Sequence, residues 1–181
     1  EVKYANDTCL TCALNGTGLT ANAAVGQRWL SVVAVEDNTR YQAGDEILIH
    51  QTQGASGAGV YEFATLASVD YAAKTLTLTT DLKHSYTAWV VCDQSGPTYC
   101  NGAQVMKVPH YRNLTVQSGG VLTCPPLRDN HWQRGGICAF RVSNALSVES
   151  GGLIDLKGKG FFASPARGFG TSISAESYDH Y

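Results

Sequence analysis

An eleven-residue pattern occurs twice in this sequence, with the two copies 32 residues apart. The first copy covers residues 113–123 and the second covers residues 145–155. Each copy alternates apolar and polar residues, reaches a Ser-Gly-Gly triplet and continues with further apolar residues. The alternation predicts strands with one buried face, and the glycine pair predicts a tight corner between them. Because such copies stack on one another, we expect a short β-solenoid in the last third of the chain.

The region before the repeat is also rich in short β-type segments. They are residues 29–35, 46–50, 60–69, 75–79, 87–92 and 103–108. Turn signals separate them, and no window combines helical periodicity with helix caps. We therefore predict an all-β chain in three parts. An extended N-terminal arm covers residues 1–24, a small β-barrel or sandwich covers 25–108, and a short β-solenoid with a glycine-rich cap covers 109–181.

The six cysteines are even in number and fall into three close pairs. The pairs are Cys9 with Cys12, Cys92 with Cys100, and Cys124 with Cys138. Short spacing favours a bridge within each pair, although six cysteines allow 15 connectivities. The first pair also has zinc-knuckle spacing, but no second motif completes a zinc site. We predict disulfides, an extracellular location and no metal or other cofactor.

Charge and hydropathy argue against two classes of partner. The net charge is −2, and charged residues make up 15% of the chain, below the roughly 25% of an average soluble domain. Lys and Arg form no stripe that could bind a phosphate backbone. No apolar stretch approaches the roughly 18 residues of a membrane helix. We expect neither a nucleic-acid partner nor membrane insertion.

Three Asn-x-Thr triplets begin at Asn6, Asn15 and Asn113, and none has proline in the middle. Such triplets are N-glycan acceptors in secreted proteins. If Leu114 points into the core, Asn113 and Thr115 point outward, because side chains alternate along a strand. We predict covalent glycans at these three asparagines.

Candidates for catalysis are few. The histidines have no partner at metal or triad spacing, and no G-x-S-x-G elbow occurs. Asp155, Lys157 and Lys159 alternate and could share one face, as an enzyme acting on polysaccharide would need, but a solvated face is the simpler interpretation. Trp132 lies in the insertion between the last two cysteines, where it can stack on a sugar or fold back onto the core. We predict that the chain is not an enzyme.

The first 24 residues form a polar segment with spaced apolar side chains. They are Val2, Tyr4, Leu10, Leu14 and Leu19. Such residues can fill alternate pockets as an added strand. Two solenoid copies need a neighbour to bury their apolar faces. We predict that the arm reaches another copy of the chain, which gives a head-to-tail linear or helical polymer. Docking of the arm on its own body is the alternative.

Two parts of the sequence resemble large, secreted, adhesin-like bacterial surface proteins. Residues 44–54 and 61–64 resemble a β-module near the N-terminus of those proteins, and residues 108–116 and 155–161 resemble the β-helical start that follows it. The resemblance covers residues 25–162 and implies a scaffold without catalytic residues. With its glycan triplets, the chain is also similar to glycosylated extracellular fibril subunits of environmental microorganisms.

These features favour a structural subunit of an extracellular fibre or surface assembly. An adhesin or carbohydrate-binding module is the first alternative. A β-solenoid enzyme that acts on polysaccharide is the second.

Overall fold

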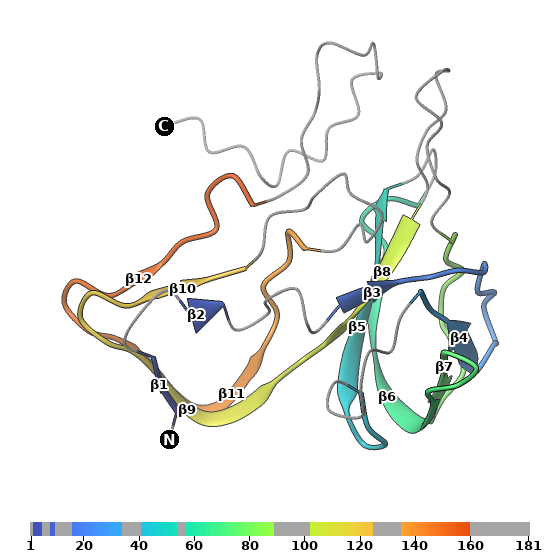
Figure 1. Ribbon diagram of the computed structural model, residues 1–181, viewed down its shortest axis with the longest axis horizontal. Helices are drawn as coiled ribbons and strands as arrows, with labels where there is room; N and C mark the ends of the chain where they lie inside the picture. Colours follow the sequence, from blue (N-terminus) through green and yellow to red (C-terminus); the bar gives the residue numbers. More distant parts are fainter. Residues whose placement is uncertain are drawn as a thin grey trace, which may run out of the picture.

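The computed structural model contains two β parts that lie side by side (Figure 1). It describes residues 2–4, 8–9, 16–33, 41–53, 57–88, 102–124 and 135–159, with the backbone alone at 2–4, 8–9 and 53. Every regular secondary-structure element in these residues is a β-strand, so the predicted all-β class is confirmed. The described ranges contain no helix long and apolar enough to cross a membrane.

The first part is a curled antiparallel sheet of six strands, which corresponds to the predicted small barrel. Its strands are β3 (Gly16–Gly18), β4 (Trp29–Ser31), β5 (Glu46–Gln53), β6 (Tyr61–Asp70), β7 (Thr75–Leu78) and β8 (Gly102–Lys107). The strand order is β3-β8-β5-β6-β7-β4. An antiparallel bridge between Leu19 and Val32 joins the end of β3 to the end of β4. This bridge brings the two edges of the sheet together, which protects them from pairing with other chains.

Strict alternation builds the core of this barrel. Every second residue of β6 is buried from Glu62 to Leu66, and Leu76 and Leu78 of β7 are buried between exposed or half-buried threonines. The buried aliphatic side chains pack around Tyr41, whose hydroxyl donates a hydrogen bond to the carbonyl of Val105 at 2.9 Å. The predicted strands over residues 46–50, 60–69, 75–79 and 103–108 are therefore observed with shifts of a few residues.

Leu19 belongs to the barrel core, which corrects the predicted arm. Its side chain is 0% exposed, and its amide donates to the carbonyl of Ala103 at 3.0 Å. β3 pairs with β8, and Ala23 bridges Tyr86. The chain from residue 16 onward is thus part of the barrel, and Leu19 is not available to contact another copy.

The second part is a parallel β-solenoid. Its strands are β1 (Val2–Tyr4), β2 (Thr8–Cys9), β9 (His110–Val116), β10 (Val121–Thr123), β11 (Arg141–Val148) and β12 (Leu153–Ile154). They form two sheets of three strands, ordered β1-β9-β11 and β12-β10-β2. Leu146 pairs with Leu114 and Leu153 pairs with Val121, which is the register of the sequence repeat. The predicted solenoid is confirmed.

The arm supplies one rung of this solenoid from the same chain (Figure 1). We call each pair of strands joined by a corner a rung. Val2 of β1 pairs with Leu114 of β9, and Thr8 of β2 pairs with Leu122 of β10. The rungs therefore stack in the order β1/β2, β9/β10 and β11/β12, and three rungs meet the usual minimum for a stable stack. The predicted docking of these two strands on another copy is not the arrangement found; they pair within their own chain.

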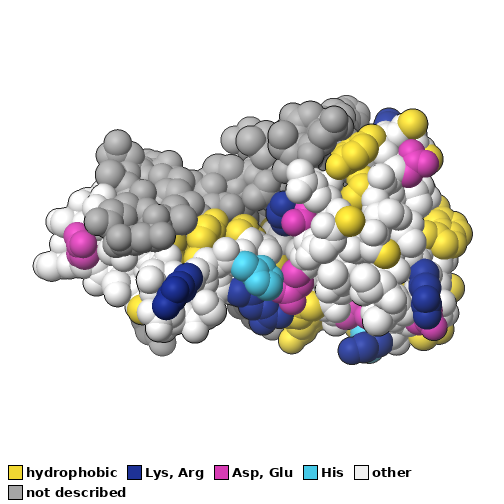
Figure 2. Space-filling view, turned by 90° about the horizontal axis from the view of Figure 1, so that it is seen from below, with side chains coloured by type: hydrophobic (Ala, Val, Ile, Leu, Met, Phe, Trp, Pro, Cys, Tyr) yellow, Lys and Arg dark blue, Asp and Glu magenta, His cyan; other side chains and the backbone are white. Residues whose placement is uncertain are grey.

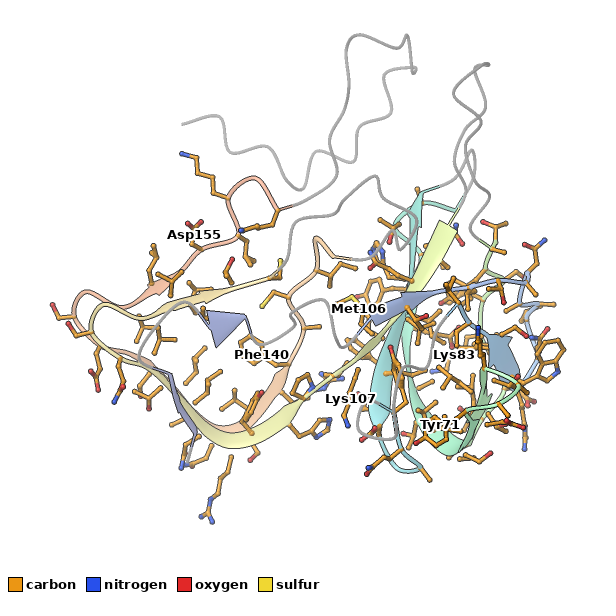
Figure 3. The ribbon with its side chains drawn as sticks, viewed as in Figure 1. Tyr71, Lys83, Met106, Lys107, Phe140 and Asp155 are labelled. Carbon is orange, nitrogen blue, oxygen red and sulfur yellow. The ribbon has the colours of Figure 1, made fainter. Side chains whose placement is uncertain are left out.

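The middle rung carries the solenoid core. Leu114, Val116 and Leu122 are at most 2% exposed. Phe140 packs against them and lies between the two solenoid sheets (Figure 3). The corners of the β9/β10 and β11/β12 rungs each turn at a glycine with positive φ, 75° at Gly119 and 83° at Gly151, a conformation that glycine adopts without steric cost.

Candidate functional site

The outer rung β11/β12 is built like an interior, but no strand among the described residues covers it. The repeat aligns Leu146 with Leu114, Val148 with Val116 and Ile154 with Leu122. The three middle-rung side chains are 0–2% exposed, whereas their three outer counterparts are 47%, 46% and 40% exposed. We call β11/β12 the open rung and these three outer side chains the open face. Because burial of a leucine or valine stabilises by about 1.5–3 kcal/mol, the open face favours contact with another apolar layer.

The backbone of the open rung is also available for pairing. Within the described residues, β11 pairs only with β9, and β12 pairs only with β10. The other edge of each strand presents amide and carbonyl groups that a further parallel strand can bond. The open rung therefore offers an apolar surface and a hydrogen-bonding edge together.

A charged cluster fixes the barrel against the solenoid. The Glu46 carboxylate on β5 accepts hydrogen bonds from Arg141 on β11 at 2.7 and 3.0 Å, and it lies 2.6 Å from the His110 ring on β9. The Arg141 guanidinium also lies 4.4 Å from the centre of the Phe63 ring on β6. We call these four residues the junction cluster. Figure 2 shows acidic, basic and histidine side chains gathered in the narrow region between the two parts.

The hydrogen bonds from Arg141 hold the pKa of the Glu46 carboxyl below its ordinary value of 4.5, and the neighbouring His110 adds to this effect. Lys107, which lies where the chain passes from barrel to solenoid (Figure 3), adds a second ion pair with Asp45 at 2.8 Å. The junction is thus held by several charge-assisted contacts from separate strands.

Replacement of Glu46 by glutamine is expected to lower Tm by about 2 °C at neutral pH. A carboxyl with a depressed pKa stabilises the fold above its unfolded pKa and loses that contribution as pH falls through the folded pKa. The difference between wild type and Glu46→Gln should therefore shrink as pH falls below the ordinary value of 4.5 and disappear once the carboxyl is protonated in the folded protein. Thermal unfolding over a pH series measures it. Asp81→Asn is the control, because Asp81 pairs with Arg28 and both side chains are more than half exposed. A difference that persists unchanged at low pH would contradict the assignment.

Cys124 and Cys138 are thiols in this structure, so the predicted bridge between them is not formed here. Burial raises the pKa of Cys124 to about 11, and the charge of Cys138 contributes to the rise. Burial also raises the pKa of Cys138. A Cys124–Cys138 bridge remains a prediction.

Oxidation is expected to link Cys124 to Cys138 and to stabilise the protein by about 3 kcal/mol, the value for a loop of roughly 15 residues. Because the thiolate is the attacking species and the pKa of Cys124 is about 11, the reaction should be roughly tenfold faster at pH 8.5 than at pH 7.5. Peptide mapping without reduction identifies the bridge, and Cys138→Ser is the control. Complete oxidation with these two thiols still free, or linked to other cysteines, would refute the pairing.

Asn113 lies on the outward face of β9, with the buried Leu114 beside it. Its side-chain oxygen accepts a hydrogen bond from Asn144 at 2.7 Å. Glycan attachment at Asn113 remains a prediction. Several other predicted site residues lie outside the described residues: Asn6, Asn15, Leu10, Leu14, Cys12, Cys92, Cys100 and Trp132. For Val2, Tyr4 and Cys9 the structure gives strand pairing alone.

Buried polar groups at one end of the barrel serve its own backbone. The Glu62 carboxylate accepts hydrogen bonds from the amides of Lys83 and His84 at 3.1–3.2 Å. The Tyr86 hydroxyl has no hydrogen-bond partner in the described structure. Burial raises its pKa, and the charge of Glu62 raises it further. This phenol is therefore neutral at physiological pH and is a poor candidate for a base.

A pocket of about 350 Å³ opens beside Tyr86, lined partly by the polar side chains of Asn22, Gln51, Ser85 and Thr87. Gln51 donates to the Thr87 hydroxyl at 2.7 Å. The described residues contain no group of three side chains arranged to hold a metal ion. Pockets that combine apolar walls with a few polar groups can bind small ligands.

The proposed shared face of Asp155, Lys157 and Lys159 is not formed by an extended strand. β12 ends at Ile154, and the amide of Lys157 donates to the Asp155 carboxylate at 2.9 Å. The segment therefore turns on itself, as Asx motifs do. The alternation read from the sequence does not place these three side chains in a row.

Sequence comparison matches no described protein family and no curated protein. Three solved structures show a distant likeness. The tailspike gp49 of Pseudomonas phage LKA1 has a TM-score of 0.38 and 16% identity, over 60% of this chain and 17% of its own. The Gp54 tailspike of Acinetobacter baumannii bacteriophage AP22, solved with a capsular saccharide, has a TM-score of 0.37 and 15% identity, over 73% of this chain and 22% of its own. The tailspike gp61 of Pseudomonas phage phi297 has a TM-score of 0.34 and 12% identity, over 82% of this chain and 36% of its own.

This chain thus spans between 17% and 36% of the length of those proteins. At these low values the likeness indicates no function for this chain.

Sequence reasoning did not name the open face, although the signal was present. The repeat identified the inward positions, and a count of two copies indicated that an outer edge needs a cover. What the sequence lacked was the position of the arm. Once β1/β2 is known to cover β9/β10 on one side, the rung left without a neighbour in the described part of the chain is β11/β12.

Proposed function

We propose that this chain is a structural, non-catalytic subunit of an extracellular fibre or surface assembly that associates head-to-tail by stacking solenoid rungs. The open face is the observation that carries the proposal, because its three side chains match a buried set and are 40–47% exposed. The occupant that we propose is a second copy of the chain. Six cysteines and three glycan triplets support an extracellular location.

The two ends of the solenoid complement each other. β1 and β2 are the outer strands at one end, and β11 and β12 are the outer strands at the other. All pairings within the solenoid are parallel. A second copy moved along the solenoid axis can therefore continue both sheets by setting its β1/β2 rung on the open rung. Such a contact joins unlike surfaces and does not close on itself, so it produces a filament.

The proposal predicts that Ile154→Asp weakens self-association by at least about 100-fold, since stacking would bury an unpaired carboxylate. Ile154 faces the interior and is 40% exposed, whereas its neighbour Leu153 faces outward and is 51% exposed. Leu153→Asp is therefore the matched control and should associate like wild type. Sedimentation velocity over a concentration series, with electron microscopy of the largest species, measures the effect. Circular dichroism verifies that each variant is folded.

The same series is run on a chain that ends at Lys159, so that residues outside the described structure do not mask the open rung. Monomers at every concentration from both chain lengths would refute the proposal. Equal loss of association in Ile154→Asp and Leu153→Asp would also refute it, because only one of these residues belongs to the open face.

A second candidate, carbohydrate binding, is supported by the pocket beside Tyr86, which has both polar and apolar walls. Its side-chain amides and hydroxyls can contact the hydroxyl groups of a sugar, and its apolar wall can contact the ring face. Asn22→Ala removes one of these groups at an exposed position and should weaken binding on a glycan array if the pocket is used. An unchanged array profile would exclude this use of the pocket.

A further inference from the structure

Two exposed polar side chains at the pocket beside Tyr86 have their oxygen atoms engaged by the backbone. The Asn22 side-chain oxygen accepts a hydrogen bond from the amide of Ala88 at 2.8 Å. The Ser85 hydroxyl oxygen accepts one from the amide of Val25 at 3.1 Å. Within the described residues, the Asn22 side-chain nitrogen and the Ser85 hydroxyl proton make no further hydrogen bond. Both side chains can therefore donate to a ligand.

The buried part of the lining repeats this arrangement. Gln51 is 2% exposed, and its side-chain oxygen accepts from the amide of Thr87 at 2.8 Å. Its side-chain nitrogen donates to the Thr87 hydroxyl oxygen at 2.7 Å, which leaves the hydroxyl proton to be donated elsewhere. The lining thus presents donors on side chains that bonds to the protein already hold in place. A ligand group that accepts hydrogen bonds fits this set better than one that only donates them.

The charges around the pocket favour a neutral acceptor over a carboxylate. Among the described lining residues none is Asp, Glu, Lys, Arg or His. The Glu62 carboxylate accepts from the amides of Lys83 and His84, the two residues that precede Ser85 in the chain. A ligand carboxylate would therefore meet a negative charge close to this wall, without a cation in the lining to offset it.

We propose that this pocket binds an N-acetylated sugar through its acetamido group. The inference rests on the second candidate function, carbohydrate binding, and names the class of sugar. The acetamido oxygen has two lone pairs and accepts from Asn22 and Ser85 without carrying a charge, while its methyl group contacts the apolar wall. The pocket volume of about 350 Å³ suits a single sugar residue, since it is at the small end of the roughly 300–1,000 Å³ of ligand pockets.

Calorimetric titration of the full chain with methyl glycosides tests this preference. The probes are methyl N-acetylglucosaminide, methyl glucoside and methyl glucuronide, together with their galacto epimers. They differ within each series by an acetamido group, a hydroxyl group or a carboxylate. In one of the two series, we expect the acetamido sugar to bind at least about tenfold more tightly than the hydroxyl sugar, and the carboxylate sugar to bind most weakly.

Asn22→Asp assigns the preference to the pocket. The carboxylate keeps an oxygen for the amide of Ala88 but has no proton to donate, so the affinity for the acetamido sugar should fall at least about tenfold. Asn144→Asp is the matched control, because it makes the same change of charge at an exposed asparagine of β11. It should bind like the wild type. Circular dichroism verifies that both variants are folded.

The outcomes distinguish this inference from the function on which it rests. Tighter binding of the acetamido sugar that is lost in Asn22→Asp alone supports it. Equal binding of the acetamido and hydroxyl sugars, or a preference for the carboxylate sugar, overturns the inference but retains carbohydrate binding. An acetamido preference that Asn22→Asp retains, or that both variants lose equally, also overturns it. Absence of binding by every probe would refute carbohydrate binding at this pocket together with the inference.

Discussion

Replacement of Leu114 by alanine is expected to lower the free energy of unfolding by about 2–5 kcal/mol, the range for a leucine truncated in a well-packed core. Leu114 is 0% exposed and packs with Val116, Leu122 and Phe140 between rungs on both sides. Because strands on both sides fix the position of β9, the cavity cannot collapse easily. Denaturant unfolding monitored by circular dichroism measures the loss.

Leu153→Ala provides the matched comparison within the same solenoid. Leu153 is 51% exposed on the outward face, so its truncation should cost about 1 kcal/mol or less. If the two substitutions lower the free energy of unfolding by the same amount, the middle rung is not the packing centre of the solenoid. In that case the argument that the open face resembles an uncovered core would also fail.

Local patterns in the sequence predicted much of this fold because they act over a few residues. The alternation at 75–79 produced β7, and the Ser-Gly-Gly triplets produced two corners that stack with Leu146 beside Leu114. The alternation reflects the two-residue period of a strand, and the glycine triplets reflect the need for a positive φ at a tight turn. The repeat also set the register between rungs, since each copy offers the same apolar positions to the next.

Contacts between distant residues could not be predicted in this way. Glu46 and Arg141 are 95 positions apart in the chain, and an isolated Glu or Arg carries no signal about its partner. The boundary at residue 24 was wrong because Leu19 looked like one of several spaced apolar arm residues. Only the closure of the barrel, through the bridge from Leu19 to Val32, distinguishes it from them.

The position of the arm was uncertain for a thermodynamic reason. A strand that pairs with β9 makes the same hydrogen bonds whether it comes from its own chain or from another. The short connection to the barrel gives β1 and β2 a high effective concentration near their own solenoid, which favours pairing within the chain. Sequence patterns encode the apolar positions but not this preference.

The corner of the open rung should tolerate almost no added side chain at Gly152. A Cβ there would lie 2.8 Å from the carbonyl oxygen of Val116, 2.9 Å from that of Gln117 and 3.1 Å from that of Glu149. These atoms belong to backbone and cannot rotate away. Gly152→Ala must therefore push the open rung off the middle rung, and we expect a loss of about 3 kcal/mol, at the upper end of overpacking effects.

Gly119→Ala is the control, because Gly119 has a φ of 75° but nothing within 4 Å of an added Cβ. The loss of stability in Gly119→Ala should come from the left-handed backbone conformation alone and amount to roughly 1–2 kcal/mol. Hydrogen exchange localises the difference. In Gly152→Ala the amides of Glu149 and Leu153, which donate to the middle rung at 2.9 Å, should exchange much faster than in wild type. Protection of these two amides at the wild-type level, with a stability loss no greater than that of Gly119→Ala, would show that the rungs are not in close contact at the corner.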